Sequence, residues 1–124
     1  IRVSLVGSEM CIRDRPHLIP AMRGIYSTMY VNFEDTQYQS IEDIYRDFYQ
    51  DSPNIELMLD GQVPEILKVA ETNNCQIGVY QSAIENQVVI ISAIDNLVKG
   101  AAGQAIECYN LITGNYQLKG LHNG

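Results

Sequence analysis

The chain has 124 residues with 15 acidic and 8 basic side chains, a formal net charge of −7, and 46% of its residues are hydrophobic. This length and composition are typical of one folded domain and exclude a disordered chain. The acidic balance and the short apolar runs argue against nucleic acid or a membrane as partner. Three widely spaced cysteines fit a reducing cytoplasm and offer no metal-ligand spacing.

The first fifteen residues, IRVSLVGSEMCIRDR, differ from the rest of the chain. Their net charge is +1, whereas the remaining residues carry 5 basic and 13 acidic side chains. Their apolar run is too short for a signal peptide, and the string resembles a translated sequencing adaptor. We therefore expect residues 1–15 to be non-native and to carry no site, with an ordinary loosely packed terminus as the alternative. The start at Ile1 without a methionine predicts a fragment.

Residues 16–49 predict an extended segment, a strand and a helix. Two prolines bracket PHLIP, and residues 25–33 are rich in Tyr, Thr, Val and Ile, which favours a strand covered on both faces. Ser40 is a good N-cap for a helix that ends before Pro53. Its apolar stripe has helical spacing and consists of Ile41, Ile44, Tyr45, Phe48 and Tyr49.

The middle of the chain predicts three further strands. Residues 55–59 form a short one that ends at the turn pair Asp60-Gly61, whereas residues 62–74 have no clear period. Residues 75–82 and 87–94 form a predicted hairpin, and the apolar run 88–91 is typical of a central strand. With the helices, these strands predict a single α+β unit.

From Asp95 onward the pattern is helical, and Gly114 is suited to the C′ position. Gly100 and Gly103 lie in the first turns, although each glycine costs about 1 kcal/mol relative to alanine inside a helix. Either close approach of a ligand or partner, or tight packing on the sheet, explains them. One broad apolar face is expected: Leu97, Val98, Ala101, Ala102, Ala105, Ile106, Tyr109 and Ile112.

Few other residues are candidates for chemistry. His17 is suited to acid/base work or to a structural hydrogen bond, and Arg23 to an anion contact or an ion pair. Lys99 near a helix start is either a weak anion contact or a solvated side chain. Cys75 and Cys108 are expected to be small buried hydrophobic residues and not nucleophiles.

Three stretches resemble one known family: PHLIPAMRGIYSTMYV, QVPEILKVAETNNCQIGV and VVIISAIDNLVKGAAGQAIECYNLITG. Their order and spacing are similar to those of the C-terminal part of N-acetyl-gamma-glutamyl-phosphate reductases, in the semialdehyde dehydrogenase group, from Pro16 to about Leu121. The resemblance implies a mixed or antiparallel sheet with helices on one face, like the C-terminal domain of glyceraldehyde-3-phosphate dehydrogenase. Residues 16–124 would then be a catalytic and dimerisation domain fragment.

The resemblance also implies an activity. Members reduce N-acetylglutamyl 5-phosphate, a small acyl phosphate, to the semialdehyde with NADPH in arginine biosynthesis, and they form homo-oligomers. We expect a cytoplasmic parent enzyme and a fragment that is inactive and does not bind NADP alone. The alternatives are a lysine-pathway aminoadipyl-phosphate reductase and a stand-alone dimerisation or interaction module.

Site residues carry over only in part. The family's catalytic cysteine and histidine lie upstream of the matched stretches, so the resemblance assigns no catalytic residue to this chain. The C-terminal helix would contact the missing NADP domain, with Asn96, Gly100 and Gly103 on the cofactor side. His17 and Arg23 match a motif beside the active site, with a substrate or interface role. Without the NADP domain, we expect the small residues 100–103 to be exposed or folded back.

Overall fold

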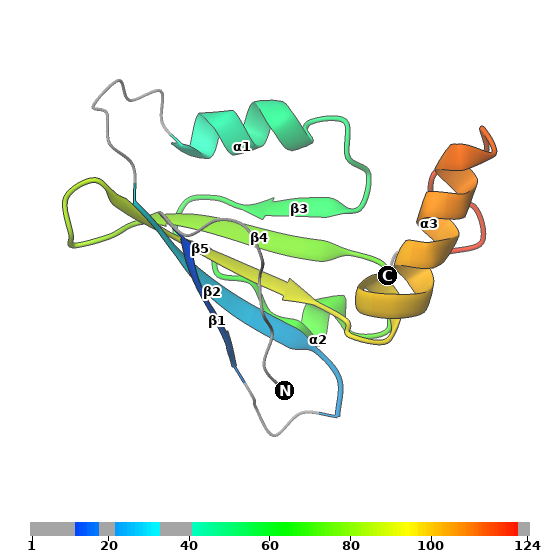
Figure 1. The fold of residues 1–124 in the computed structure, drawn as a ribbon, viewed down its shortest axis with the longest axis horizontal. Helices are drawn as coiled ribbons and strands as arrows, with labels where there is room; N and C mark the ends of the chain where they lie inside the picture. Colours follow the sequence, from blue (N-terminus) through cyan, green and yellow to red (C-terminus); the bar gives the residue numbers. More distant parts are fainter. Residues whose placement is uncertain (1–11, 18–21, 33–40, 122–124) are drawn as a thin grey trace.

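The computed structural model describes residues 12–17, 22–32 and 41–121. Figure 1 shows the elements in chain order. The strands are β1 (Ile12–His17), β2 (Ile25–Asn32), β3 (Ile55–Met58), β4 (Cys75–Gln81) and β5 (Gln87–Ile94). The helices are α1 (Ile41–Tyr49), α2 (Ile66–Val69), the π-helical turn η1 (Val98–Ala102) and α3 (Gly103–Ile112).

The five strands form one mixed sheet in the order β1-β2-β5-β4-β3. Only β3 and β4 run parallel; the other neighbours are antiparallel. The apolar strand β5 is central, and the predicted hairpin joins it to β4. The α+β fold with a mixed sheet is therefore confirmed.

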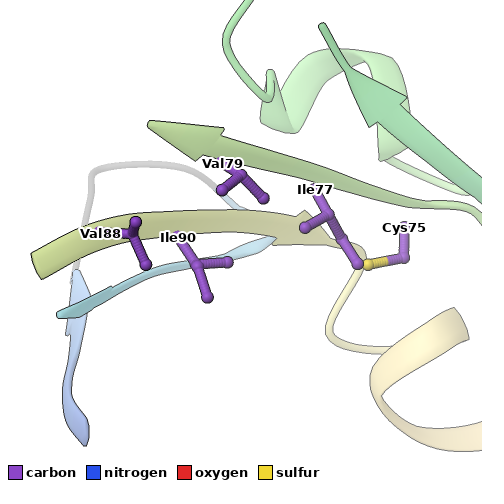
Figure 2. Close-up of a cluster of buried hydrophobic side chains, with 5 residues drawn as sticks. All are labelled: Cys75, Ile77, Val79, Val88 and Ile90. Atoms are coloured by element: carbon purple, nitrogen blue, oxygen red, sulfur yellow. The ribbon is translucent and has the colours of Figure 1, made fainter. Parts of the chain in front are cut away.

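The hydrophobic core lies on one face of this sheet. Figure 2 shows side chains of β4 and β5 that leave the sheet on the same side: Cys75, Ile77, Val79, Val88 and Ile90. Ile41, Tyr45 and Tyr49 of α1 pack against them, as the helical stripe predicts. The outer part of that stripe, Ile44 and Phe48, is exposed. The predicted N-cap Ser40 lies outside the described residues.

The short helix α2 lies on the opposite face, which differs from the expectation that all helices share one face. Gln76 points away from the core, and its side-chain oxygen accepts a hydrogen bond from the Glu65 backbone at the start of α2 (2.8 Å). Tyr80, on the same face, donates its hydroxyl to the carbonyl of Gln62. The connection from β3 to α2 therefore crosses this second face over β4.

Strands β2 and β1 differ from what the sequence predicts for these residues. Strand β2 ends at Asn32, and Phe33 lies outside the described residues. Its residues 26–31 are half-buried on both faces, so neither face has the full cover that the sequence predicts. Strand β1 crosses the predicted boundary at residue 15 and pairs antiparallel with β2 along its whole length.

Helix α3 stands at the end of the sheet and does not lie across a face (Figure 1). It ends as predicted, because Gly114 donates to the Leu111 carbonyl and Asn115 to the Asn110 carbonyl, the pattern of a Schellman cap. Its inward residues are Gly103, Glu107 and Asn110, whereas most of the predicted apolar face is exposed. Gly100, Ala101 and Ala102 are exposed as expected, but Gly103 is buried.

Candidate functional site at the carboxyl end of the central strand

The predicted site residues approach one another at one end of the sheet. Ile94, the last residue of β5, pairs with Ile25 at the start of β2 and with Cys75 at the start of β4. The loop before β2 and the turn after β5 therefore meet here. These two segments carry Arg23 and Asn96.

Asp95 is the centre of this end of the sheet and is fully buried. Its Oδ1 accepts hydrogen bonds from the backbone N–H groups of Leu97 (2.7 Å) and Val98 (2.9 Å), which caps the following helix. Its Oδ2 accepts one from the backbone N–H of Glu71 (2.7 Å). Burial acts to raise the pKa of Asp95, but these bonds and the charge of Arg23 outweigh it and leave the pKa below its ordinary value.

Asn96 holds the loop before β2. Its Oδ1 accepts a hydrogen bond from the backbone N–H of Gly24 (2.8 Å). Gly24 has a φ of 119°, and a Cβ at this position would collide with Ile66. Asn96 therefore has a structural contact through its side-chain oxygen, whereas its Nδ2 amide makes no hydrogen bond among the described residues.

Arg23 lies between two carboxylates. Its Nη1 is 3.5 Å from Asp95 Oδ2 and 4.0 Å from Glu71 Oε1, and its side chain is partly exposed. Glu71 has a φ of 64°, a left-handed conformation that is unusual outside glycine. The guanidinium thus has an ion-pair partner within the chain, the second of the two roles predicted for it.

The glycines of the helix start have different surroundings. A Cβ on the exposed Gly100 would lie 3.3 Å from the Asp95 carbonyl oxygen and 3.8 Å from Ile25. A Cβ on Gly103 would collide with Asn73 Oδ1 and with the backbone of Val98. Gly100 and Asn96 thus lie at the accessible end of the sheet, whereas Gly103 lies in the interior.

Lys99 contacts a carboxylate, as one of its two predicted roles requires, but that carboxylate belongs to this chain and the Lys99 side chain is not solvated. Its Nζ is 2.6 Å from Glu107 Oε2, and only 12% of its side chain is exposed. Glu107 also accepts hydrogen bonds from Asn54, Asn73 and Gln117. Burial acts to raise the pKa of Glu107, but the bonds from Lys99, Gln117 and Asn73 outweigh it and lower the pKa.

His17 and the cysteines have other surroundings, although Cys75 begins β4 beside Ile94 at the same end of the sheet. The His17 Nε2 is 2.9 Å from the Thr28 hydroxyl, and its ring lies 5.9 Å from that of Tyr26. Cys75 is buried as predicted, and burial raises the pKa of its thiol to about 11. Cys108 is exposed on α3, contrary to the prediction that it is buried.

The described residues hold no group of three or more His, Cys, Asp or Glu side chains that could bind a metal ion. In residues 12–17, 22–32 and 41–121, no helix is long and apolar enough to cross a membrane.

The buried polar residues of this region are not predicted as site residues from the sequence. Asp95, directly after a strand and before a helix, has the position and chemistry of an N-cap, so a usable signal was present. The cluster of Asn54, Asn73 and Glu107 has no local signal, because its members come from three separate segments.

Comparisons with known proteins match the chain to a reductase family. The family model for the semialdehyde dehydrogenase dimerisation domain matches residues 3–96. N-acetyl-gamma-glutamyl-phosphate reductases from Alkaliphilus metalliredigens and Crocosphaera subtropica are 40% and 37% identical over 116 and 123 residues. These alignments cover 93% and 98% of this chain. The chain spans about a third of the length of these relatives, 34% and 35%.

Solved structures give the same fold. Aspartate semialdehyde dehydrogenase II from Vibrio cholerae superposes with a TM-score of 0.61 at 20% identity, over 79% of this chain and 29% of that protein. A probable aspartate-semialdehyde dehydrogenase from Pseudomonas aeruginosa gives 0.58 at 21% identity, over 73% and 27%. The resemblance to the reductases is thus confirmed, and this chain belongs to the semialdehyde dehydrogenase dimerisation-domain family.

Proposed function

We propose that this chain is the C-terminal part of an NADPH-dependent N-acetyl-gamma-glutamyl-phosphate reductase. The observation that carries the proposal is the identity of about 40% with such reductases over nearly the whole chain. The parent would reduce the acyl phosphate to the aldehyde and release phosphate, as a cytoplasmic enzyme of arginine biosynthesis. The proposal also takes residues 1–15 as a non-native prefix, although the family match begins at residue 3 and β1 takes its first four residues from this stretch.

The described residues support a role beside the reaction and not in its covalent step. Acyl transfer to a cysteine needs a thiolate, and the buried Cys75, with its pKa raised to about 11, stays protonated near neutral pH. In this proposal the nucleophile comes from the remaining part of the parent, as the resemblance implies. The chain alone is therefore expected to have no reductase activity.

We infer that two of the three residues suggested by the resemblance, Asn96 and Gly100, would contact NADP. Both lie at the accessible end of the sheet, where Gly100 is exposed and the Asn96 side-chain oxygen, but not its amide, is held by Gly24. Gly103 does not fit, because Asn73 and Val98 occupy the space beside it. NADPH, when bound, supplies the reducing electrons, and Arg23 would orient a substrate or contact a neighbouring subunit.

A hybrid enzyme tests this proposal. Residues 16–124 replace the C-terminal third of the Alkaliphilus metalliredigens reductase, and NADPH oxidation is followed with N-acetylglutamyl 5-phosphate. We expect activity from the hybrid and none from the chain alone. A folded, inactive hybrid contradicts the proposal, and activity only on a carrier-bound aminoadipyl phosphate favours the lysine-pathway alternative. An Asn96→Ala hybrid is expected to raise the KM for NADPH more than that for the acyl phosphate.

We further propose that a second copy of this chain packs on the sheet face opposite the core. The match to the dimerisation domain spans every strand together with α1 and α2 but excludes α3. The sheet is therefore a better candidate for the dimer contact than α3. On the central strand, Val88 and Ile90 of the core face are 4% and 6% exposed, whereas Val89 and Ile91 of the opposite face are only half-buried.

The composition of that face supports a protein partner. Its positions on β2 and β5 that are half-buried or exposed carry no charged side chain in a chain with a net charge of −7: Tyr26, Thr28, Tyr30, Asn32, Gln87, Val89 and Ile91. Interface cores are depleted of charge and enriched in tyrosine. This face therefore suits a self-complementary dimer contact.

Sedimentation of the purified chain tests the dimer. Val89→Lys is expected to weaken self-association about 100-fold, since it buries a charge in the contact. Phe48→Lys, on the exposed side of α1, serves as the matched control, and circular dichroism checks that both variants fold. Thr28→Lys replaces Val89→Lys if the latter does not fold. A wild-type chain that stays monomeric at every concentration measured contradicts the dimer. A dimer that is dissociated by Phe48→Lys and not by Val89→Lys contradicts the choice of this face.

A further inference from the structure

Helix α3 is held to the sheet by a buried carboxylate. Glu107 is 4% exposed, and its Oε2 accepts hydrogen bonds from Lys99 (2.6 Å), Asn54 (3.0 Å) and Asn73 (2.9 Å). Its Oε1 accepts one from Gln117 (2.6 Å). Asn54 precedes β3, Asn73 precedes β4 and Gln117 follows α3, so one side chain joins four segments. This arrangement fixes the rotation of α3 about its own axis.

Asp95 fixes the other end of the same helical segment. It caps Leu97 and Val98 from the end of β5, as described above. The segment from Asp95 to Glu107 therefore begins and ends at residues whose side chains are hydrogen-bonded to other parts of the domain. The number of residues between these two points decides which helical geometry fits.

Between Lys99 and Glu107 there is one residue more than a regular α-helix would need to align these two side chains. Lys99 and Glu107 are eight residues apart, which places them about 80° apart around an α-helix at 3.6 residues per turn. In η1, however, the amides of Gly100, Ala102 and Gly103 donate to the carbonyls of Asp95, Leu97 and Val98, five residues back. The π-helical turn thus takes up one extra residue. Lys99 and Glu107 are therefore related like residues seven apart in an α-helix, about 20° from alignment around the helix axis.

Gly103 belongs to the same arrangement. It lies one α-helical turn before Glu107, and its missing Cβ leaves the space that Asn73 Oδ1 occupies. That oxygen has no hydrogen-bond partner among the described residues, whereas the Nδ2 of the same side chain donates to Glu107. Asn73 therefore lies tightly against the helix in order to reach the carboxylate.

We propose that Glu107 is a positioning residue, whose contacts with Lys99, Asn54, Asn73 and Gln117 keep the extra residue between Asp95 and Glu107 in the π-helical turn. The turn sets the rotation of the helix start relative to α3 and so determines how Gly100 and Asn96 face outward. Without Glu107, the turn relaxes to α-helical hydrogen bonding. The importance of this rotation for NADP rests on the proposed function, but the rotation itself does not.

The hydrogen-bond partner of the Gly100 amide tests the inference in the full 124-residue chain. Couplings across hydrogen bonds, measured by NMR on the labelled protein, identify the carbonyl that accepts each amide proton. In the wild type we expect Gly100 to couple to Asp95. In Glu107→Gln this coupling is lost, and a coupling to Asn96, four residues back, replaces it. Glu85→Gln, an exposed glutamate in the β4–β5 turn, is the matched control and keeps the wild-type pattern.

Two more variants cover a failure to fold. Lys99→Met removes the same pair from its other side and is expected to change the coupling in the same way. Deletion of the exposed Ala101 removes the extra residue and is expected to give a folded chain with α-helical couplings throughout and the Lys99–Glu107 pair retained. A folded Glu107→Gln or Lys99→Met that keeps the Asp95 coupling overturns the inference, and so does a deletion that unfolds the chain. No result of this experiment depends on reductase activity.

Discussion

Gly100 and Gly103 lie three residues apart, but they differ in whether a Cβ atom could be added without a collision. A Cβ at Gly103 would collide with Asn73 and the Val98 backbone, whereas at Gly100 it would lie 3.3 Å from its nearest neighbour. We expect Gly103→Ala to lower the free energy of unfolding by about 1–3 kcal/mol, because overpacking outweighs the better helix propensity of alanine. Gly100→Ala, its control, should change it by about 0.5 kcal/mol or less. Urea denaturation measures both, and equal effects would contradict this difference in packing.

At this scale the sequence predicts residue types better than residue partners. Cys75 is the buried thiol that its strand position predicts. Lys99 contacts an anion, as one of the two alternatives predicted, but that anion is Glu107 of this chain. The spacing of the two residues would not align them in an α-helix, and η1 brings them together. For Arg23, the ion-pair alternative depends on Asp95 and Glu71, which lie far away in sequence and which no local pattern brings close.

Helix α3 is amphipathic in the reverse sense to most surface helices of a globular domain. Its polar residues Glu107 and Asn110 face inward, and Ile112 is 85% exposed. We expect Ile112→Lys to change the free energy of unfolding of this chain by about 0.5 kcal/mol or less, whereas Ile90→Ala in the core should cost about 2–5 kcal/mol. Thermal or urea unfolding compares them. A large loss from Ile112→Lys would mean that this face packs within the chain.

Elements with a strong period are predicted well. Strands β4 and β5 agree with their predicted ranges to within one residue, and α1 follows its apolar stripe. Helix α2 has only four residues, too few to establish a period, and it falls in the stretch without one. The π-helical turn has no signal in its own sequence, because it depends on the number of residues between Asp95 and Glu107, which contacts with the rest of the fold hold in place.

The whole domain should lose stability in acid. Asp95 and Glu107 have pKa values below their ordinary range when folded, so the unfolded chain binds more protons as the pH falls. Their contribution is complete above the ordinary carboxyl pKa of about 4 and is lost below it. We expect the free energy of unfolding to fall steeply below about pH 4, and less steeply in Glu107→Gln. Urea denaturation across a pH series measures this, and identical slopes would contradict it.

The overall class follows from the sequence, but the order of the strands does not. Alternating and continuous apolar runs predict a mixed sheet with helices. Which strands become neighbours depends on tertiary packing: β2 lies beside β5, and β3 runs parallel to β4. The placement of Arg23 beside Asp95 is a consequence of that order, so the geometry of the candidate site could not be predicted before the sheet was known.

The pairing of β2 with β5 also has a consequence for the rate of folding. Partners in this ladder are at least 55 residues apart, whereas only five residues lie between β4 and β5. Closing the larger loop costs more chain entropy, so the hairpin should form early and β2 should join late. Val79→Ala on β4 would then slow refolding, whereas Val31→Ala on β2 would mainly accelerate unfolding, as stopped-flow kinetics can measure. Until β2 arrives, one edge of the central strand stays open to pairing with another chain, which makes the interval before docking the period of greatest risk of aggregation.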